Sequence, residues 1–343
     1  MTDLAALAER FRTFAAVECG TSPRYRWLAE GIAGDAGLLA LAAHGDHGPK
    51  PNLFLAAVHA LLLDHPHAPL AAWYPSVSGY ASTGGDPFPA FRAFALDHAD
   101  EVRALMAERL VQTNEVARAG VLLPAFALVA DLAGGAPLAL VEVGASAGLL
   151  LLWDRYAYAY GDGAIYGDPA SPVRIQTELR DDHRPPLPTT LPRVAARTDL
   201  DLNPLDVRDA AGARWLQALV WPDQPERMAR LRAAIDVVRT EPPRLLRGDA
   251  VALLPSILAE QPEGAALVVF HCHTLNQFPA EARAAFEDVL RGCARPIYRV
   301  GLEYRGEPEM TLYEYRDGRL ASERVLARYG AHGGGVTWMD DRL

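Results

Sequence analysis

The segment Gly144–Gly148 combines small residues with a serine, and these residue types suit two different chemistries. Glycines at both ends of the segment fit a serine nucleophile exposed on a sharp turn between a strand and a helix. Small residues also let a ligand approach the backbone closely. The residues that would line such a cradle are Gly144, Ala145, Ser146 and Gly148. Glu142, two residues before Gly144, favours the ligand-binding loop over the serine nucleophile, because its carboxylate can contact the ammonium tail of a nucleotide-like cofactor.

Polar residues at the ends of the next two predicted strands fit the same cofactor. Asp201 ends the second strand and can accept both ribose hydroxyls, with Asp199 as the alternative acid and Asn203 beside it. The segment Gly248–Ala250 ends the third strand, and Asp249 within it can hold an adenine amine. Ligands of parallel sheets bind at the carboxyl ends of the strands. The three groups are therefore expected to form one cofactor site.

Two histidines follow the fourth and most apolar predicted strand. Alternation along that strand puts His271 and His273 on one face, with Cys272 between them pointing the other way. Either histidine can serve as a general base near neutral pH, and His271 is also close enough in sequence to the strand end to contact the cofactor. Asn276 can orient a polar substrate. The alternative is a pair of structural histidines bonded to backbone.

A polar group interrupts an otherwise apolar helical region before the first predicted strand. Asn114, Glu115 and Arg118 fall within one predicted helical turn, and Asn114 and Arg118 share a face. We expect this face to line the substrate cleft and to contribute to catalysis. A solvated stripe or a local salt bridge is the alternative.

The elements that must position these residues alternate between strand and helix after residue 134. Strands are expected at "PLALVEV", "RVAARTDLDL", "PRLL" and "GAALVVF", with a helix directly after the glycine segment. Alternation of this kind predicts a parallel sheet with helices on both faces. Three more strands close the chain, the last two joined by a tight turn at Asp317-Gly318. The excursion 161–192 is expected to hold a small hairpin around "SPVRIQTEL".

Residues 1–133 have the apolar periodicity of helices and few β-branched residues. The last of these helices is predicted to end at Gly134-Gly135. The sequence therefore predicts an α/β protein with two domains: an all-helical cap or substrate domain over residues 1–133, and a mostly parallel Rossmann-like sheet domain over 134–343.

Composition narrows the class of protein. Of the 343 residues, 50% are hydrophobic and 22% are charged, which is enough apolar surface for a sizeable core. The formal net charge of −10 argues against a nucleic-acid partner. The three cysteines are far apart, so neither a disulfide framework nor a metal site is expected. With no secretory signal or membrane span predicted, we expect a cytoplasmic protein that acts on a small molecule.

The ordered motifs resemble those of the class I S-adenosylmethionine-dependent methyltransferases. "VEVGASAG" is similar to their first motif, "DLDLNP" to their acidic second-strand motif and "RGDAVALL" to their third. The resemblance implies S-adenosylmethionine as cofactor and methyl transfer as the reaction. Two features depart from the pattern. Asp201 lies much further from the glycine segment than usual, and "HCHTLNQF" replaces the Asn/Asp-Pro-Pro-Tyr signature of amino-methylating enzymes.

The whole chain also resembles a bacterial family defined by a domain of unknown function, in segments such as "VQTNEVARAG", "YGDPASPV" and "HCHTLNQ". We therefore expect an S-adenosylmethionine-dependent methyltransferase of unspecified acceptor and oligomeric state. Three alternatives remain: a serine hydrolase using Ser146, a non-catalytic protein that binds S-adenosylmethionine or S-adenosylhomocysteine, and another reaction of the same cofactor. The hydrolase would need Asp249 and a later histidine, and it is disfavoured because its motif follows the first predicted strand.

Overall fold

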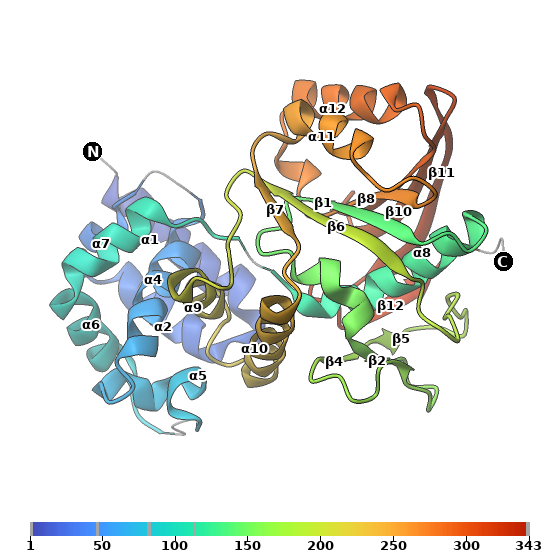
Figure 1. The fold of residues 1–343 in the computed structure, drawn as a ribbon. Helices are drawn as coiled ribbons and strands as arrows, with labels where there is room; N and C mark the ends of the chain where they lie inside the picture. The colour runs from blue at the N-terminus through green and yellow to red at the C-terminus, as the bar shows by residue number, and fades with distance from the viewer. Residues whose placement is uncertain (1–2, 46–47, 81–83, 113, 341–343) are drawn as a thin grey trace. The chain divides into compact units, whose positions relative to one another are not determined.

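The computed structural model describes residues 3–45, 48–80, 84–112 and 114–340. The chain forms two compact units. The first comprises residues 1–113 and 208–232, and the second comprises 114–207 and 233–343. The boundary near residue 113 comes earlier than the predicted one at 133, and the first unit also recruits a later segment of the chain. Figure 1 shows the elements of both units along the chain.

The first unit is helical. Its elements are α1 (Leu4–Thr13), η1 (Phe14–Glu18), η2 (Cys19–Thr21), α2 (Pro23–Ala33), α3 (Ala36–Ala42), α4 (Lys50–Asp64), η3 (Pro69–Trp73), α5 (Pro75–Ser78), α6 (Phe88–Asp97), α7 (Ala99–Glu108), α9 (Ala210–Ala218) and the start of α10 (Pro225–Thr240). α4 is largely apolar and ten of its 15 residues are buried, as expected for the central helix of a bundle. The predicted break at Pro222 is confirmed, since α9 and α10 flank it.

The second unit is built on a nine-stranded sheet with the order β5-β12-β11-β10-β9-β8-β1-β6-β7. Its strands are β1 (Leu138–Val143), β5 (Glu178–Leu179), β6 (Val194–Asp201), β7 (Arg244–Arg247), β8 (Ala266–Cys272), β9 (Ile297–Tyr304), β10 (Pro308–Arg316), β11 (Arg319–Tyr329) and β12 (Gly335–Trp338). β7, β6, β1, β8 and β9 are mutually parallel. The mixed α/β class with a large, mostly parallel sheet is confirmed.

The closing strands also follow the prediction. β9, β10 and β11 form an antiparallel meander, and the turn between the last two holds Asp317 and Gly318 at φ of 51° and 73°. Positive φ at both central residues is the geometry of a tight type I′ hairpin. β12, which pairs antiparallel with β11, was not predicted because it is four residues long and follows glycines.

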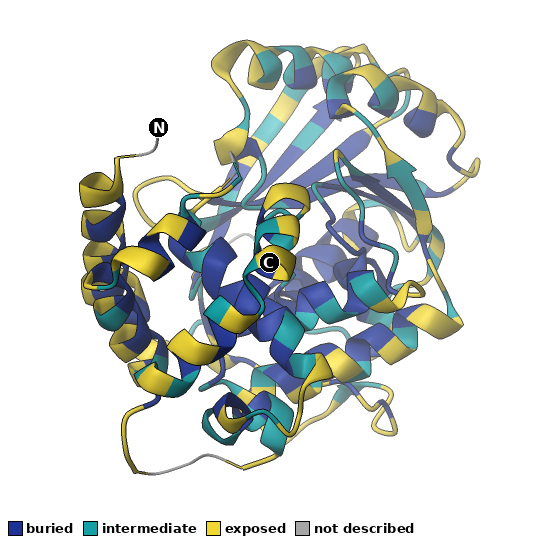
Figure 2. Ribbon diagram, turned by 90° about the vertical axis from the view of Figure 1, so that its left-hand side faces the viewer, coloured by how far each residue is buried: buried dark blue, intermediate teal, exposed yellow. Residues whose placement is uncertain are grey.

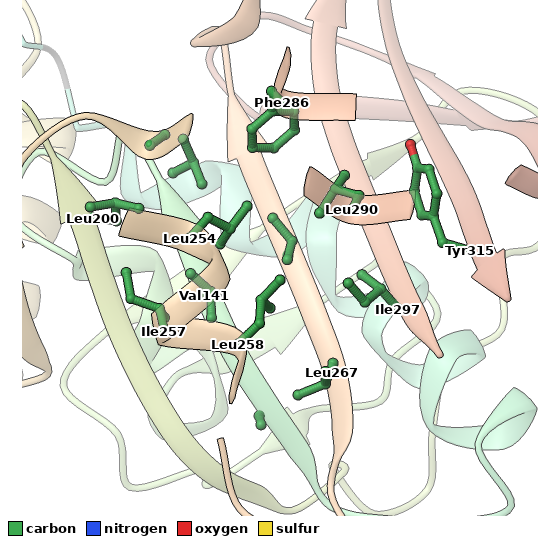
Figure 3. Packing of buried hydrophobic residues seen from close by; sticks show 14 of the residues in the cluster. Val141, Leu200, Leu254, Ile257, Leu258, Leu267, Phe286, Leu290, Ile297 and Tyr315 are labelled. Atoms are coloured by element: carbon green, nitrogen blue, oxygen red, sulfur yellow. The ribbon is translucent and has the colours of Figure 1, made fainter. Parts of the chain in front are cut away.

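Helices cover both faces of the sheet. α11 (Ala250–Ala259) and α12 (Ala280–Gly292) lie on one face, where Leu254, Ile257 and Phe286 pack on β1, β6, β8 and β9 (Figure 3). On the other face α8 (Ala119–Leu132) places Phe126 against Phe270 of β8. Figure 2 shows buried strands beneath helices whose outer surfaces are exposed. Burial on both faces explains why β1 and β8 are nearly continuous apolar runs in the sequence.

Two local predictions were wrong. The residues after the glycine segment were expected to form a helix as far as Tyr160. They form short 3-10 turns, η5 (Leu149–Arg155), with a kink at Leu152, and then enter β2 (Ala157–Ala159). The buried tyrosines at 156, 158 and 160 alternate with alanines, which is a strand pattern. The expected hairpin around "SPVRIQTEL" is absent: β4 (Arg174–Gln176) pairs with β2 in a three-stranded sheet that includes β3 (Tyr166–Gly167), and β5 pairs with β12.

Candidate functional site

Two buried carboxyl groups lie side by side near the carboxyl ends of β1 and β6. Glu142 and Asp199 occupy paired positions in the two parallel strands, so their side chains share one face of the sheet. Glu142 is 2% exposed and Asp199 is 0% exposed. Chain order in the parallel part of the sheet reverses between β1 and β8. Such a reversal marks the usual ligand position in open α/β sheets.

Oxygens of this pair lack hydrogen-bond partners within the described part of the chain. They are Oε2 of Glu142 and both carboxyl oxygens of Asp199. Burial raises the pKa of Glu142 well above its usual value, the charges of Asp199 and Asp201 add to this effect, and Arg118 opposes it. Burial, followed by Asp201, also raises the pKa of Asp199. Buried acceptors without partners are costly, so this pair is poised for a ligand that donates hydrogen bonds or carries positive charge.

The glycine segment forms a tight loop above these acids. Gly144, Ser146 and Gly148 all have positive φ, at 74°, 59° and 64°. A Cβ added to Gly148 would lie 3.3 Å from Oδ2 of Asp199, so glycine permits the loop to approach the acid. A Cβ added to Gly144 would collide with Thr274. Glycine suits both positions for two reasons: the backbone there is left-handed, and neighbouring side chains leave little room for a Cβ.

Asn114 contributes from the segment that precedes α8. Its Nδ2 donates to the carbonyl oxygen of Ala145 at 2.8 Å, which fastens it to the glycine loop. Its Oδ1 is buried without a hydrogen-bond partner among the residues described. The structure thus adds a fourth unsatisfied acceptor to the same neighbourhood, and this amide belongs to the predicted set.

Asp201 has a structural role that the sequence did not reveal. Its Oδ2 accepts from the backbone N–H of Ser146 at 2.8 Å, and its Oδ1 accepts from that of Asn203 at 2.7 Å. Arg247 donates in turn to Oδ1 of Asn203 at 3.1 Å. Asp201 therefore holds the glycine loop in place, while Asp199, the alternative acid, presents the free oxygens.

The third predicted group lies at the start of α11. Asp249 is exposed and caps the helix, since its Oδ1 accepts from the backbone N–H of Ala252 at 3.0 Å. The backbone N–H of Gly248 donates to the carbonyl oxygen of Asp201 at 3.0 Å, while Ala250 is buried. This segment thus adjoins the end of β6, and the capping role accounts for Asp249.

The predicted helical turn at 114–118 was wrong in part. Asn114 and Glu115 are non-helical, and Glu115 caps the 3-10 helix η4 (Val116–Arg118) by accepting from the backbone N–H of Ala117 at 3.0 Å. Capping draws the acid out of the helix, because its carboxylate replaces the missing intrahelical partner. Arg118 is buried and its Nε donates to the carbonyl oxygen of Ala331 at 3.1 Å.

His271 projects from the opposite face of the sheet to Glu142. Its ring contacts Phe286 of α12, and its Nδ1 lies 2.7 Å from Oε1 of Glu303 on β9. Burial lowers the pKa of His271, and Glu303 offsets part of this effect. The structure therefore does not bring His271 to the carboxyl pair at which it was expected.

His273 has different neighbours because β8 ends at Cys272. Its φ of 54° breaks the alternation on which the prediction of a shared face rested. Its Nε2 lies 3.1 Å from the hydroxyl of Tyr329, and its ring also contacts Tyr304. Burial, followed by the nearby charge of Arg118, lowers the pKa of His273 to about 4. This histidine is uncharged at neutral pH.

A cavity of about 210 Å³ lies on the α12 side of the sheet. His271 and Asn276 line it, together with charged residues of β9 and α12 that sequence reasoning missed. Arg299, Gly301 and Glu303 alternate along β9 and all face this cavity. Two charged residues at alternate positions in an otherwise apolar strand were the signal that would have identified them.

The described residues do not form a metal site or a membrane-spanning helix. Throughout the described ranges, no three side chains of histidine, cysteine, aspartate or glutamate gather as metal ligands. No helix in those ranges combines the length and the apolar character needed to cross a membrane.

Comparison with known proteins gives one match. A family model described as "Uncharacterized protein conserved in bacteria (DUF2332)" matches residues 8–338. No curated protein and no solved structure matches the chain significantly. Because the matched range spans nearly the whole chain, including both compact units, the chain belongs to this bacterial family.

Proposed function

We propose that the second unit binds S-adenosylmethionine at the carboxyl ends of β1, β6 and β7, and that the protein is a methyltransferase for a small molecule. The observation that carries the proposal is the pair of buried carboxyl groups, Glu142 and Asp199, whose oxygens lack partners in the described chain beneath a glycine loop. The residues proposed to hold the cofactor are Asn114, Glu142, Gly144, Ala145, Ser146, Gly148, Asp199 and the segment Gly248–Ala250.

The chemistry of these acceptors selects among nucleotide-like ligands. The unsatisfied acceptors identified beside the loop are oxygens of Glu142, Asp199 and Asn114. A pyrophosphate would bring negative charge to two carboxyl groups, and the short η5 offers no long helix N-terminus to compensate for it. S-adenosylmethionine instead brings an ammonium group, a sulfonium centre and ribose hydroxyls. Each of these is attracted to, or donates to, an acidic acceptor.

The order of the strands supports the same proposal. Numbered along the chain, the five parallel strands follow the order 3-2-1-4-5 of Rossmann-type sheets. The antiparallel strand beside β9 fits the reversed strand of class I methyltransferases in direction, although β10 follows β9 directly in a meander. The short η5 in place of a first helix is a second departure. The proposal therefore rests on the carboxyl pair more than on topology.

The acceptor is proposed to lie near Arg118 and His273. The charge of Arg118 acts on both Glu142 and His273, so this side chain is near to both of them. When bound, the cofactor supplies an electrophilic methyl group. His273 is uncharged at neutral pH and can accept a hydrogen bond from the acceptor, which would orient it toward the methyl group. The net charge of −10 favours a small molecule over a nucleic acid, and the cytoplasm supplies the cofactor.

Calorimetric titration of the full chain with S-adenosylmethionine and S-adenosylhomocysteine tests the proposal. We expect both to bind, and Asp199→Asn to weaken binding by about tenfold or more, because an amide NH2 replaces a carboxyl oxygen that would accept from the ligand. Asp288→Asn, an exposed position on α12, serves as the matched control and should leave binding unchanged. Absence of heat with either compound at about 1 mM would overturn the proposal. Binding without turnover of any acceptor would favour the non-catalytic alternative.

A serine hydrolase is the second candidate, and one observation favours it. Ser146 has φ of 59° on a turn that follows a strand, which is the strained setting of a nucleophile elbow. Against it, the nucleophile is 6% exposed, and His271 and His273 already contact Glu303 and Tyr329. Hydrolysis of p-nitrophenyl acetate that disappears in Ser146→Ala would establish this function in place of methyl transfer.

A further inference from the structure

The cavity between the sheet and α12 has the polar groups of a second ligand site. We propose that it binds a small hydroxycarboxylate, with the carboxylate held by Arg299 and Arg283 and the hydroxyl donating to Nε2 of His271. All three side chains line the cavity. The site lies on the other face of the sheet from Glu142 and Asp199, so it is independent of the proposed cofactor site.

The hydrogen-bond network around Glu303 turns His271 into an acceptor. The carboxylate of Glu303 accepts from the backbone N–H groups of Thr274 at 3.0 Å and Leu275 at 2.9 Å, as well as from His271. Burial alone would raise the pKa of Glu303, but these bonds outweigh it and lower the pKa. An ionised Glu303 fixes the proton of the neutral imidazole on Nδ1. Nε2 then carries a lone pair.

That lone pair is unused within the described structure. His271 is 1% exposed, and its Nε2 has no hydrogen-bond partner among the described residues. The ring lies across Gly301, where an added Cβ would come within 3.1 Å of Nε2. A buried acceptor of this kind requires a donor, and the cavity that His271 lines supplies room for one.

Arg299 supplies the complementary donor. Its Nη1 pairs with Glu287 at 2.7 Å and its guanidinium lies 3.6 Å from the ring centroid of Tyr313, yet its Nε is buried without a partner in the described chain. Arg299 lies two residues before Gly301, which pairs with His271, so the two residues are diagonal neighbours on one face of the sheet with backbone positions about 7–8 Å apart. A ligand of a few heavy atoms spans that distance.

The charges that line the cavity define the ligand further. The lining carries three glutamates and three arginines, so its formal charges cancel. A lining of this kind suits a monoanion better than a phosphate dianion. The six residues are Glu287, Glu303, Glu309, Arg283, Arg299 and Arg305. An ammonium donor to Nε2 would face repulsion from Arg299 close by. A neutral hydroxyl avoids this repulsion. A carboxylate and a hydroxyl on neighbouring carbons therefore fit the arrangement best.

Titration of the full chain with lactate, propionate and lactamide, followed by saturation-transfer NMR, tests the proposal. Propionate lacks the hydroxyl and lactamide lacks the carboxylate. We expect lactate to bind and each analogue to bind about tenfold more weakly, because each leaves one buried protein group unpaired. Failure of lactate to bind at about 10 mM, or equal binding of propionate, would overturn the proposal.

Variants assign the two ends of the ligand. In His271→Asn the amide can still donate to Glu303 but Nε2 is gone, so the preference for lactate over propionate should vanish. Arg283→Gln should weaken both ligands, whereas Arg291→Gln, an exposed arginine of the same helix paired with Asp288, should weaken neither. Unchanged preference in a folded His271→Asn contradicts the proposal.

A second measurement covers the case in which His271→Asn does not fold. In the unaltered protein with ¹⁵N-labelled histidine, lactate should shift the Nε2 resonance of His271 and propionate should not. Identical shifts with both ligands, or none, would refute the role of Nε2. S-adenosylmethionine should bind equally with and without lactate, so failure of this site is distinguishable from failure of the proposed function.

Discussion

At the scale of single residues, burial of acids decides how the candidate site behaves. Glu142 and Asp199 are paired across β1 and β6 and are removed from water, and both have raised pKa values. The sequence predicted an acid at each strand end, since "VEV" and "DLDLN" are visible. It did not distinguish Asp199 from Asp201, because that choice depends on which carboxylate the backbone of the glycine loop binds, at Ser146.

The raised pKa of Glu142 predicts how stability changes with pH. A carboxyl whose pKa is higher in the folded state binds more protons there than in the unfolded chain, so stability falls as pH rises from the unfolded value near 4.5 through the folded one. Each such group contributes a slope of about 1.4 kcal/mol per pH unit in that window. Glu142→Gln should flatten this slope and raise the free energy of unfolding above neutral pH.

Urea unfolding without ligand, repeated between pH 5 and pH 8, measures this slope. Glu281→Gln, an exposed glutamate at the start of α12, is the control and should keep the slope of the unaltered chain. An unchanged slope in Glu142→Gln would mean that Glu142 is ionised in the folded protein.

The glycine loop gives a second prediction at this scale. Gly144→Ala places a Cβ at φ of 74° and against the side chain of Thr274. We expect a loss of about 2–4 kcal/mol in unfolding free energy, part from backbone strain and part from the collision. Thr274→Ala in the same chain should recover the part that is due to collision. If the double variant is no more stable than Gly144→Ala, strain alone explains the glycine.

At the scale of elements, the sequence predicted strands better than what joins them. β1, β6, β7, β8 and β9 were expected because they are short apolar runs that end at polar residues or turns. β10 and β11 were expected because a tight Asp-Gly turn joins them. The short η5 was not, since "GLLLLWDRY" is as apolar as a buried helix. Local side-chain bonds accompany its end: the hydroxyl of Tyr156 donates to the carbonyl oxygen of Leu149, and that of Tyr158 donates to the carbonyl oxygen of Trp153.

Ion pairs hold η5 against β6, and they differ in burial. Arg197 of β6 donates to both carboxylate oxygens of Asp154 at 2.8 and 2.7 Å and is 11% exposed. Arg155 contacts the same Asp154 but is 44% exposed. Arg197→Gln should lower the unfolding free energy by about 3 kcal/mol, because Asp154 is left buried with its main partner removed. Arg155→Gln should cost less than about 1 kcal/mol.

Chemical denaturation of the two variants measures both losses under one condition. The comparison is internal, because both arginines also reach Glu241 and share Asp154. Equal losses would show that solvent exposure does not govern these pairs and that η5 depends on its apolar contacts instead.

At the scale of the whole molecule, the division of the chain is what sequence reasoning could least reach. Near Gly135 the sequence changes from helical periodicity to alternating strand and helix patterns. The predicted domain boundary at 133 was based on this change. Contacts instead assign α8 to the second unit and residues 208–232 to the first. α9 packs with helices that precede it by more than a hundred residues, yet its own pattern is that of any amphipathic helix. Its local sequence therefore does not predict which unit it belongs to.

The return of the chain to the first unit predicts that an N-terminal fragment is incomplete. α9 packs on α4, where Trp215 is 1% exposed and donates to the carbonyl oxygen of Leu110 at 2.8 Å, and His59 lies 3.0 Å from the carbonyl oxygen of Ala218. A fragment of residues 1–112 would expose this apolar face and should unfold without a cooperative transition. Adding a peptide of residues 208–232 should restore one.

Tryptophan fluorescence of that peptide, which contains Trp215 and Trp221, reports the association, since burial of Trp215 beside α4 should shift the emission to shorter wavelength. A peptide with Trp215→Ala and Leu216→Ala removes two buried side chains and is the control that should not bind. Cooperative unfolding of the fragment alone would show that α9 is an accessory to this unit. Restoration only by the unaltered peptide would show that a bundle encoded in two separate stretches of chain needs both to reach its native stability.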